Sequence, residues 1–348
     1  MGLRSRLAFV AAALLIVLLV SYLAQKRKAT QELAPSDFPS LPGRGFFMGL
    51  LPTPARNQTF ADAYLQASGC CDFVPLWGRP SPFYELANDI SGPWGRTFLD
   101  EYIRRNGMFP LVLVSFIGQN MTLRTPPDMP GSTLSSEEWR RAYRKAVLDV
   151  VRTAKPPFIC IGNEVNRWHE RYGAAQGDPN GFQNYVTLYE ELYDAVKAIS
   201  PQTKVFCTFS REIVSENREA NLSVLSMFSA GKMDLLVLTS YPYAVKGINR
   251  PSDIPDDYYL KAAACFPGKP FGFTEVGWAS LEPFGGENGQ ADFLKDLTSR
   301  LTLDRGLDLT LLGYAWLHDL DDKDAIGLIY RNGTAKLGFE VWQKLFSS

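Results

Sequence analysis

The sequence predicts an α/β fold in which a single (β/α)8 TIM barrel is preceded by an N-terminal transmembrane helix. Eight short apolar runs alternate with amphipathic segments between residue 45 and the C-terminus. The runs are almost continuously apolar, which is typical of parallel strands covered on both faces. An uncharged stretch at residues 7–24 precedes them. The roughly 300 residues that follow suit one barrel of this kind, which usually needs about 250.

The first element is the apolar stretch LAFVAAALLIVLLVSYLA at residues 7–24. Eighteen uncharged residues just span a hydrocarbon core when they are helical. Basic residues flank both ends, so the charge balance does not decide orientation. The competing interpretation is a cleaved signal peptide, but the basic run Lys26–Lys28 directly after the stretch is unusual for a cleavage region. We therefore expect residues 1–28 to form a membrane anchor.

A linker is expected between the anchor and the barrel. Residues 29–44 contain three prolines and several polar side chains. This composition predicts an extended, poorly packed spacer that holds the folded part away from the membrane. The barrel itself is expected to occupy residues 45–348.

Eight strands are predicted from the apolar runs. They are residues 45–51, 72–78, 109–118, 158–166, 204–210, 233–243, 269–278 and 309–320. In a barrel built this way, functional side chains lie at the C-terminal ends of the strands. The residues that end these runs are therefore the first place to look for chemistry.

Helical periodicity is clearest in three segments between the strands. From Trp139 to Val150, apolar residues recur at helical spacing after a cap-like acidic run. The same spacing extends from Phe182 to Ile199, and Pro201 closes that segment. A last helix is expected at residues 337–346. Strands that alternate with helices eight times give the order of a (β/α)8 barrel.

Composition limits the kinds of partner. Apolar residues make up 46% of the chain and charged residues 21%, as in a globular protein. Lys and Arg total 36 against 37 Asp and Glu, so no excess of positive charge favours nucleic acid. No glycine-rich phosphate-binding loop follows a predicted strand, which argues against a nucleotide site. The oligomeric state is left open.

Metal sites and cofactors are not expected. The five cysteines lack CxxC spacing and the chain has two histidines, which argues against zinc. The acidic run at 319–324 lacks the spacing of a calcium loop and is interpreted as a solvated loop. Cys160 and Cys207 are interpreted as small core residues, whereas a disulfide involving Cys70 or Cys71 is left open.

Two of the predicted strands end in a carboxylate. Glu164 closes the fourth run within Gly-Asn-Glu at 162–164, and Glu275 closes the seventh within Thr-Glu-Val-Gly-Trp at 274–278. A carboxylate after an apolar strand is costly to bury unless it is paired or reactive. A structural ion pair explains either residue alone equally well. Two of them, on strands four and seven of eight, favour a pair that faces across one barrel mouth.

These motifs resemble those of the retaining glycoside hydrolases of clan A, whose barrels carry carboxylates on strands four and seven. The resemblance covers about residues 45–348, and by eye it is nearest to endo-galactanases and plant-type β-1,3-glucanases. In that clan the strand-four Glu, preceded by Asn, is the general acid/base, and the strand-seven Glu is the nucleophile. The resemblance therefore implies these roles for Glu164 and Glu275.

The resemblance also implies two residues that hold the substrate. Tyr241, in Ser-Tyr-Pro after strand six, is expected to contact the nucleophile, and Trp316 on strand eight is expected to floor the sugar subsite.

Three further candidates end predicted strands. Trp77 and Trp278 carry rings that can stack on sugars, although core packing explains Trp278 equally well. Arg79 is placed to hydrogen-bond the nucleophile or the sugar, and a surface position is an equal alternative.

The sequence thus predicts a retaining β-glycosidase that acts on an oligo- or polysaccharide by double displacement. One carboxyl group must be protonated to help the leaving oxygen depart, and the other must be ionised to attack the anomeric carbon. Asn163 is placed to hold the sugar 2-hydroxyl. The barrel is expected outside the cytoplasm, anchored through residues 7–24 or secreted if that segment is cleaved.

The same barrel allows other functions. It could bind a glycan without turnover, although the presence of both carboxylates argues against this. It could also transfer the sugar to an acceptor other than water with the same residues. A lyase or aldolase would want a Schiff-base lysine or a metal cluster at the strand ends, and the sequence shows neither there.

Overall fold

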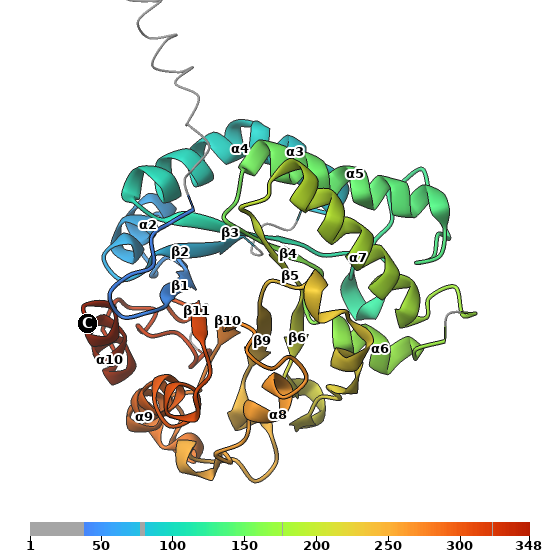
Figure 1. The fold of residues 1–348 in the computed structure, drawn as a ribbon. Coiled ribbons are helices and arrows are strands. Elements are labelled where there is room, and N and C mark those ends of the chain that lie inside the picture. Colours follow the sequence, from blue (N-terminus) through green and yellow to red (C-terminus); the bar gives the residue numbers. More distant parts are fainter. Residues whose placement is uncertain (1–37, 77–80, 176, 322) are drawn as a thin grey trace, which may run out of the picture. The chain divides into compact units, whose positions relative to one another are not determined.

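A closed ring of parallel strands organises the fold (Figure 1). The computed structural model describes residues 38–348 apart from 77–80, 176 and 322. The strands of the ring are β1 (Phe47–Leu51), β2 (Phe73–Leu76), β3 (Phe109–Val114), β4 (Phe158–Ile161), β5 (Lys204–Phe206), β6 (Thr208–Ser210), β9 (Leu236–Ser240), β10 (Phe271–Val276) and β11 (Leu309–Trp316). Because β5 and β6 are two parts of one strand, separated at Cys207, the ring has eight positions and closes.

The predicted (β/α)8 barrel is confirmed, since each of the eight predicted runs contains one strand of the ring, which in the fifth run is divided into β5 and β6. Several runs are longer than the strands inside them. The run 158–166, for example, contains β4 at Phe158–Ile161 and then the first residues of helix α6. The residues beyond each strand leave the sheet and form the mouth of the barrel, which is why apolar content alone overestimates strand length.

Helices cover the outside of the ring (Figure 1). The predicted segments appear as α5 (Glu137–Ala154), α7 (Phe182–Ile199) and α10 (Leu337–Phe346). The other helices are α2 (Phe60–Ser68), α3 (Phe83–Ser91), α4 (Pro93–Gly95), α6 (Val165–Tyr172), α8 (Leu260–Ala263) and α9 (Gly286–Thr298).

Strict alternation of strand and helix is broken after the fifth strand. The hairpin β7 (Glu212–Ile213) and β8 (Arg218–Glu219) follows β6 in place of a helix, and only the short α8 follows β9. The expectation of a regular helix after every strand was therefore wrong at these two positions.

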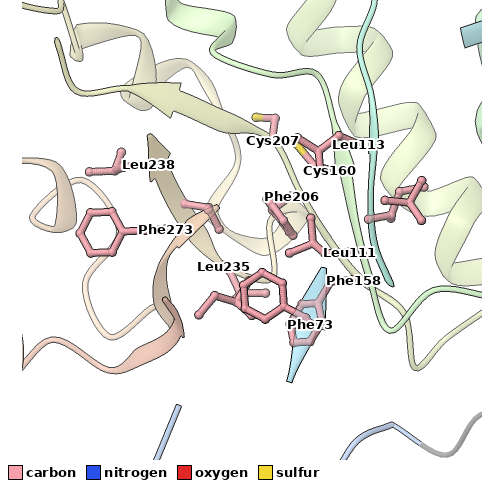
Figure 2. Close-up of a cluster of buried hydrophobic side chains, with 14 of the residues drawn as sticks. Phe73, Leu111, Leu113, Phe158, Cys160, Phe206, Cys207, Leu235, Leu238 and Phe273 are labelled. Carbon is pink, nitrogen blue, oxygen red and sulfur yellow. The ribbon is translucent and has the colours of Figure 1, made fainter. Parts of the chain in front are cut away.

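Apolar side chains from several strands meet in a buried cluster (Figure 2). Phe73, Phe158 and Phe273 are completely buried there. Cys160 and Cys207 lie in the same cluster as unpaired thiols, which confirms their interpretation as small core residues. Burial raises the pKa of the Cys160 thiol to about 12, so it is held neutral and apolar. All five cysteines are described, and each is a free thiol.

Part of the predicted linker packs on the barrel. The Phe38 ring lies 5.2 Å from the Phe158 ring at the start of β4. Arg44 donates to the Phe346 carbonyl oxygen at 2.9 Å and pairs with Asp72. The compact unit accordingly begins at Phe38 rather than at residue 45. The prolines of this segment predicted a free spacer. The free energy gained by packing the Phe38 ring against the barrel favours the docked segment instead.

The predicted transmembrane helix is not supported. Among the residues that the structure describes, no helix is both long and apolar enough to cross a membrane. The two longest described helices, α5 and α7, are amphipathic and carry charged side chains on one face. Residues 7–24, on which the prediction rested, lie outside the described residues. The fold class that the described residues support is the (β/α)8 barrel.

Candidate active site

Glu164 stands at a sharp turn between β4 and α6. The turn begins at Gly162, whose φ is +102°, where a Cβ would come within 2.5 Å of the Tyr185 hydroxyl. Glu164 itself has a φ of 50°, in the left-handed region that side chains rarely adopt. Its backbone N–H donates to Thr208 Oγ1 at 2.8 Å, which holds this backbone in place. Strained backbone of this kind is common at functional sites.

The Glu164 carboxylate is held by two donors at the mouth. Thr239 Oγ1 on β9 donates to Oε1 at 2.8 Å, and Arg167 Nη1 donates to Oε2 at 2.5 Å. The Glu164 side chain is 20% exposed, so it remains open to a ligand. Next to it, Asn163 Oδ1 accepts a 2.7 Å hydrogen bond from Thr208 Oγ1.

Glu275 lies on β10 and receives a hydrogen bond from Tyr241. The Tyr241 hydroxyl donates to Oε1 of Glu275, which is the contact that the resemblance led us to expect. The Tyr241 ring can approach because Gly277 has no side chain; a Cβ there would lie 2.7 Å from the ring. The position of Tyr241 thus depends on a glycine two residues after Glu275.

Thr239 connects the two carboxylates. It is the register partner of Glu275 across β9 and β10, and its hydroxyl donates to Glu164. The register shifts between Phe273 and Glu275, which sets the direction of the side chains that follow. The structure therefore brings Glu164 and Glu275 to the same part of the mouth.

The surroundings of Glu275 shift its pKa. Burial raises its pKa to about 7, the Tyr241 hydrogen bond opposes that rise, and the charge of Glu164 adds to it. Burial and the nearby charge of Glu275 raise the pKa of Tyr241 well above its usual value. Tyr241 is therefore a neutral donor at ordinary pH. The largest cause of the Glu275 shift is desolvation, which favours the protonated form of the carboxyl group.

A second buried carboxylate, Glu212, supports Tyr241 from behind. Glu212 Oε2 accepts the backbone N–H of Tyr241 at 2.6 Å, and Oε1 accepts from Ser240 and Tyr258, each at 2.8 Å. Burial raises the pKa of Glu212 to about 7. The sequence pattern did not single out this residue, although a Glu two residues after the fifth apolar run resembles the signal that drew attention to Glu164 and Glu275.

Trp316 and Trp278 have different surroundings. Trp316 is half-buried, and its indole N–H donates to Asp324 Oδ2 at 2.6 Å, so a residue of the acidic loop orients the ring. Trp278 is completely buried, donates to the Phe284 carbonyl oxygen at 3.0 Å and stacks on Phe293. The structure does not bring Trp278 to the mouth, because its ring fills the space between β10 and α9. Core packing is the correct interpretation of Trp278.

Two predicted residues, Trp77 and Arg79, lie outside the described residues.

Asn163 and Glu164 line a cavity of about 320 Å³ at the ends of β2, β3 and β4. His318, by contrast, is buried, and its Nδ1 lies 2.6 Å from the Thr53 carbonyl oxygen.

Solved structures are similar to this chain in fold, whereas their sequences differ widely from it. No protein-family model and no curated protein sequence matches the chain. GH5_18 from Streptomyces cattleya in complex with GlcNAc is similar with a TM-score of 0.61 at 14% identity, over 88% of this chain and 80% of that one. The shared fold is the TIM barrel. The predicted resemblance to clan A barrels is thereby confirmed at the level of fold.

Two further similar structures are longer proteins. A family 39 glycoside hydrolase from Bacteroides cellulosilyticus WH2 has a TM-score of 0.59 at 15% identity, over 89% of this chain and 65% of that one. A beta-glucuronidase from an uncultured Clostridium sp. has a TM-score of 0.56 at 13% identity, over 87% of this chain. This chain spans 50% of the length of the clostridial protein.

Proposed function

We propose that this protein is a retaining β-glycosidase that hydrolyses a glycan by double displacement. Glu164 is the general acid/base and Glu275 is the nucleophile. The observation that carries the proposal is the arrangement of two carboxylates at one barrel mouth, with Tyr241 donating to Glu275 and Thr239 connecting Glu275 to Glu164. The glycoside hydrolases of the same fold support it.

In the first step an ionised Glu275 oxygen attacks the anomeric carbon. The bond from that carbon to the leaving oxygen breaks, and Glu164 gives its proton to this oxygen. The product is a glycosyl ester on Glu275 with inversion at the anomeric carbon. Asn163, beside Glu164, is placed to hold the sugar 2-hydroxyl during this step.

In the second step water takes the place of the leaving group. Glu164, now ionised, removes a proton from the water as its oxygen attacks the anomeric carbon. The ester bond to Glu275 breaks and the carboxylate is regenerated. Two inversions give net retention of configuration. A sugar hydroxyl in place of water would give transglycosylation with the same residues.

Two effects shift the pKa of Glu275 in opposite directions. The Tyr241 hydrogen bond favours the ionised form that a nucleophile needs, whereas burial favours the protonated form. Arg167 pairs with Glu164 in the free protein and must release it before Glu164 can donate a proton.

The test combines variants with labelling. Glu164→Gln and Glu275→Gln are expected to lower hydrolysis of the β-linked glycans that the wild type cleaves by more than about a thousandfold. A 2-deoxy-2-fluoro glycoside should trap an ester on Glu275, detectable by peptide mass spectrometry. A label on Glu164 would reverse the roles, and NMR evidence for an inverted product would overturn double displacement. Glu137→Gln, at an exposed position on α5, is the control and should retain activity.

A further inference from the structure

Two adjoining cavities lie on one side of the candidate carboxylate pair. The first is the cavity of about 320 Å³ that Asn163 and Glu164 line. The second has a volume of about 590 Å³ and lies beyond the ends of β1 and β2. Leu76, at the end of β2, lines both cavities. The two cavities therefore adjoin at Leu76, on the side of the barrel mouth where Glu164 lies.

Arginines dominate the charge of both cavities. Arg124 and Arg167 line the first, and Arg56 and Arg331 line the second. Among the residues described as lining these cavities, Glu164 is the one carboxylate. The whole chain is nearly neutral, with a net charge of -1, so this excess of positive charge is local. A cleft lined by one sign of charge concentrates ligands of the opposite sign.

The guanidinium groups of the first cavity have donors to spare. Each guanidinium carries five N–H donors. Arg167 uses Nη1 on Glu164 and its side chain is 36% exposed, while Arg124 Nη1 reaches the Ser81 carbonyl oxygen at a long 3.4 Å. Within the described part of the chain, neither guanidinium makes a second hydrogen bond. Their remaining donors are available to a ligand in the cavity beside Glu164.

The second cavity adds aromatic surface. The Trp94 and Phe98 rings stack at 5.2 Å, and Phe60 packs edge-on against Phe98 with half of its surface exposed. Aromatic rings supply large apolar contact area, and sugar C–H faces pack on them. This cavity thus combines a surface for a sugar ring with the charges of Arg56 and Arg331.

We propose that the substrate of this site is an acidic glycan whose sugars carry carboxylates, and that Arg124 and Arg167 bind the carboxylate next to the bond that is cleaved. This inference rests on the proposed function and names its substrate class. A carboxylate is favoured because its planar pair of oxygens matches the planar fork of a guanidinium. A substrate carboxylate would also compete with Glu164 for Arg167 and so release Glu164.

The test uses full-length protein and sugars that differ only in charge. Hydrolysis of 4-nitrophenyl β-glucuronide and β-galacturonide is compared with that of the matching glucoside and galactoside. Binding of oligogalacturonate, of carrageenan, which is a galactan with sulfate and no carboxylate, and of neutral galactan is measured in parallel by calorimetry with the Glu275→Gln variant. We expect at least a tenfold preference for the carboxylated member of each pair, and weaker binding at high salt.

Variants connect the preference to the arginines. Arg124→Gln should lower the acidic-to-neutral ratio about tenfold, mainly through KM, and Arg124→Lys should restore part of it because the charge returns without the fork. Arg141→Gln, on the exposed face of α5, is the matched control and should leave the ratio unchanged. Circular dichroism melting of each variant separates loss of recognition from loss of folding.

The outcomes distinguish this inference from the proposed function. If acidic glycans bind preferentially but no sugar is hydrolysed, the proposed function fails and the anionic site stands. Hydrolysis with equal or better use of neutral sugars overturns the anionic site alone. A preference for carrageenan that oligogalacturonate does not share assigns the site to sulfate and overturns the carboxylate. The absence of binding to any acidic glycan overturns the inference entirely.

Discussion

Glu212 accepts the backbone N–H of Tyr241 at 2.6 Å and thereby supports, from inside the fold, the residue that donates to Glu275. Glu212 is almost completely buried, and no catalytic proton transfer is assigned to it. It acts through Tyr241, and its role is to fix the position of that ring.

Replacement of Glu212 tests this positioning role. Glu212→Ala leaves the Tyr241 N–H without an acceptor and should lower the free energy of unfolding by about 2–4 kcal/mol. Glu212→Gln keeps an acceptor and should lose less than half of that, with a kcat decrease that exceeds any change in KM. Urea unfolding and steady-state kinetics measure both effects. Equal stability of the alanine variant and the wild type would contradict the role.

The stability contributed by Glu212 should depend on pH. Burial raises its pKa to about 7 from the ordinary value of 4.5, so the folded state binds this proton more tightly than the unfolded state. The contribution is therefore complete below about pH 4.5 and is lost as the pH rises through 7. Melting temperatures from pH 5 to 8 should show the wild type losing its advantage over Glu212→Gln as pH increases. A constant difference would contradict the raised pKa.

Activity should rise with pH because the proposed nucleophile, Glu275, is buried. Glu275, with a pKa raised to about 7, must lose its proton before it can attack, so kcat/KM should increase through about pH 7. Tyr241→Phe removes the hydrogen bond that lowers this pKa, so the rise of kcat/KM should move to higher pH. Activity should therefore fall more at pH 6 than at pH 8. Tyr193→Phe, whose hydroxyl binds Asp234, should leave the profile unchanged. If kcat/KM of Tyr241→Phe rose at the same pH as that of the wild type, Glu275 would not be the group that titrates there.

Replacement by alanine should lower stability at Trp278 and substrate affinity at Trp316. Trp278→Ala empties a buried site and should cost about 3–5 kcal/mol of stability. Trp316→Ala should cost little stability and raise KM about tenfold, since the ring is only half-buried and is the proposed floor of the sugar subsite. Denaturant unfolding and substrate titration of both variants measure the contrast. A stable Trp278→Ala protein with impaired substrate binding would return Trp278 to the site.

A buried ion pair holds the loop that carries Asp324. Lys336 Nζ lies 2.8 Å from Asp319 Oδ1, and the two side chains are 0% and 4% exposed. Removal of one partner leaves a buried charge, so Lys336→Met or Asp319→Asn should each cost about 3–5 kcal/mol. The combined variant should cost less than the sum. Additive losses in a double-mutant cycle would contradict a direct coupling.

Local patterns in the sequence determined the framework of this protein. The eight strands and the bounds of α7 and α10 follow from the lengths and periods of apolar runs, which neighbouring residues set by themselves. Glu164 and Glu275 were found for the same reason, because each ends a run. The start of the compact unit at Phe38 and the missing helix after β6 depend on packing between distant segments, and the sequence pattern did not predict them.

The tertiary structure decided how the side chains meet. Trp278 comes just after β10 and Trp316 ends β11, so the two look alike in sequence. Packing against α9 nevertheless buries Trp278, while Trp316 stays partly exposed. The contacts of Tyr241 with Glu275 and with Glu212 join residues that lie 34 and 29 positions apart. Such contacts depend on strand register and barrel closure, because a shift of one residue turns every side chain to the opposite face of the sheet.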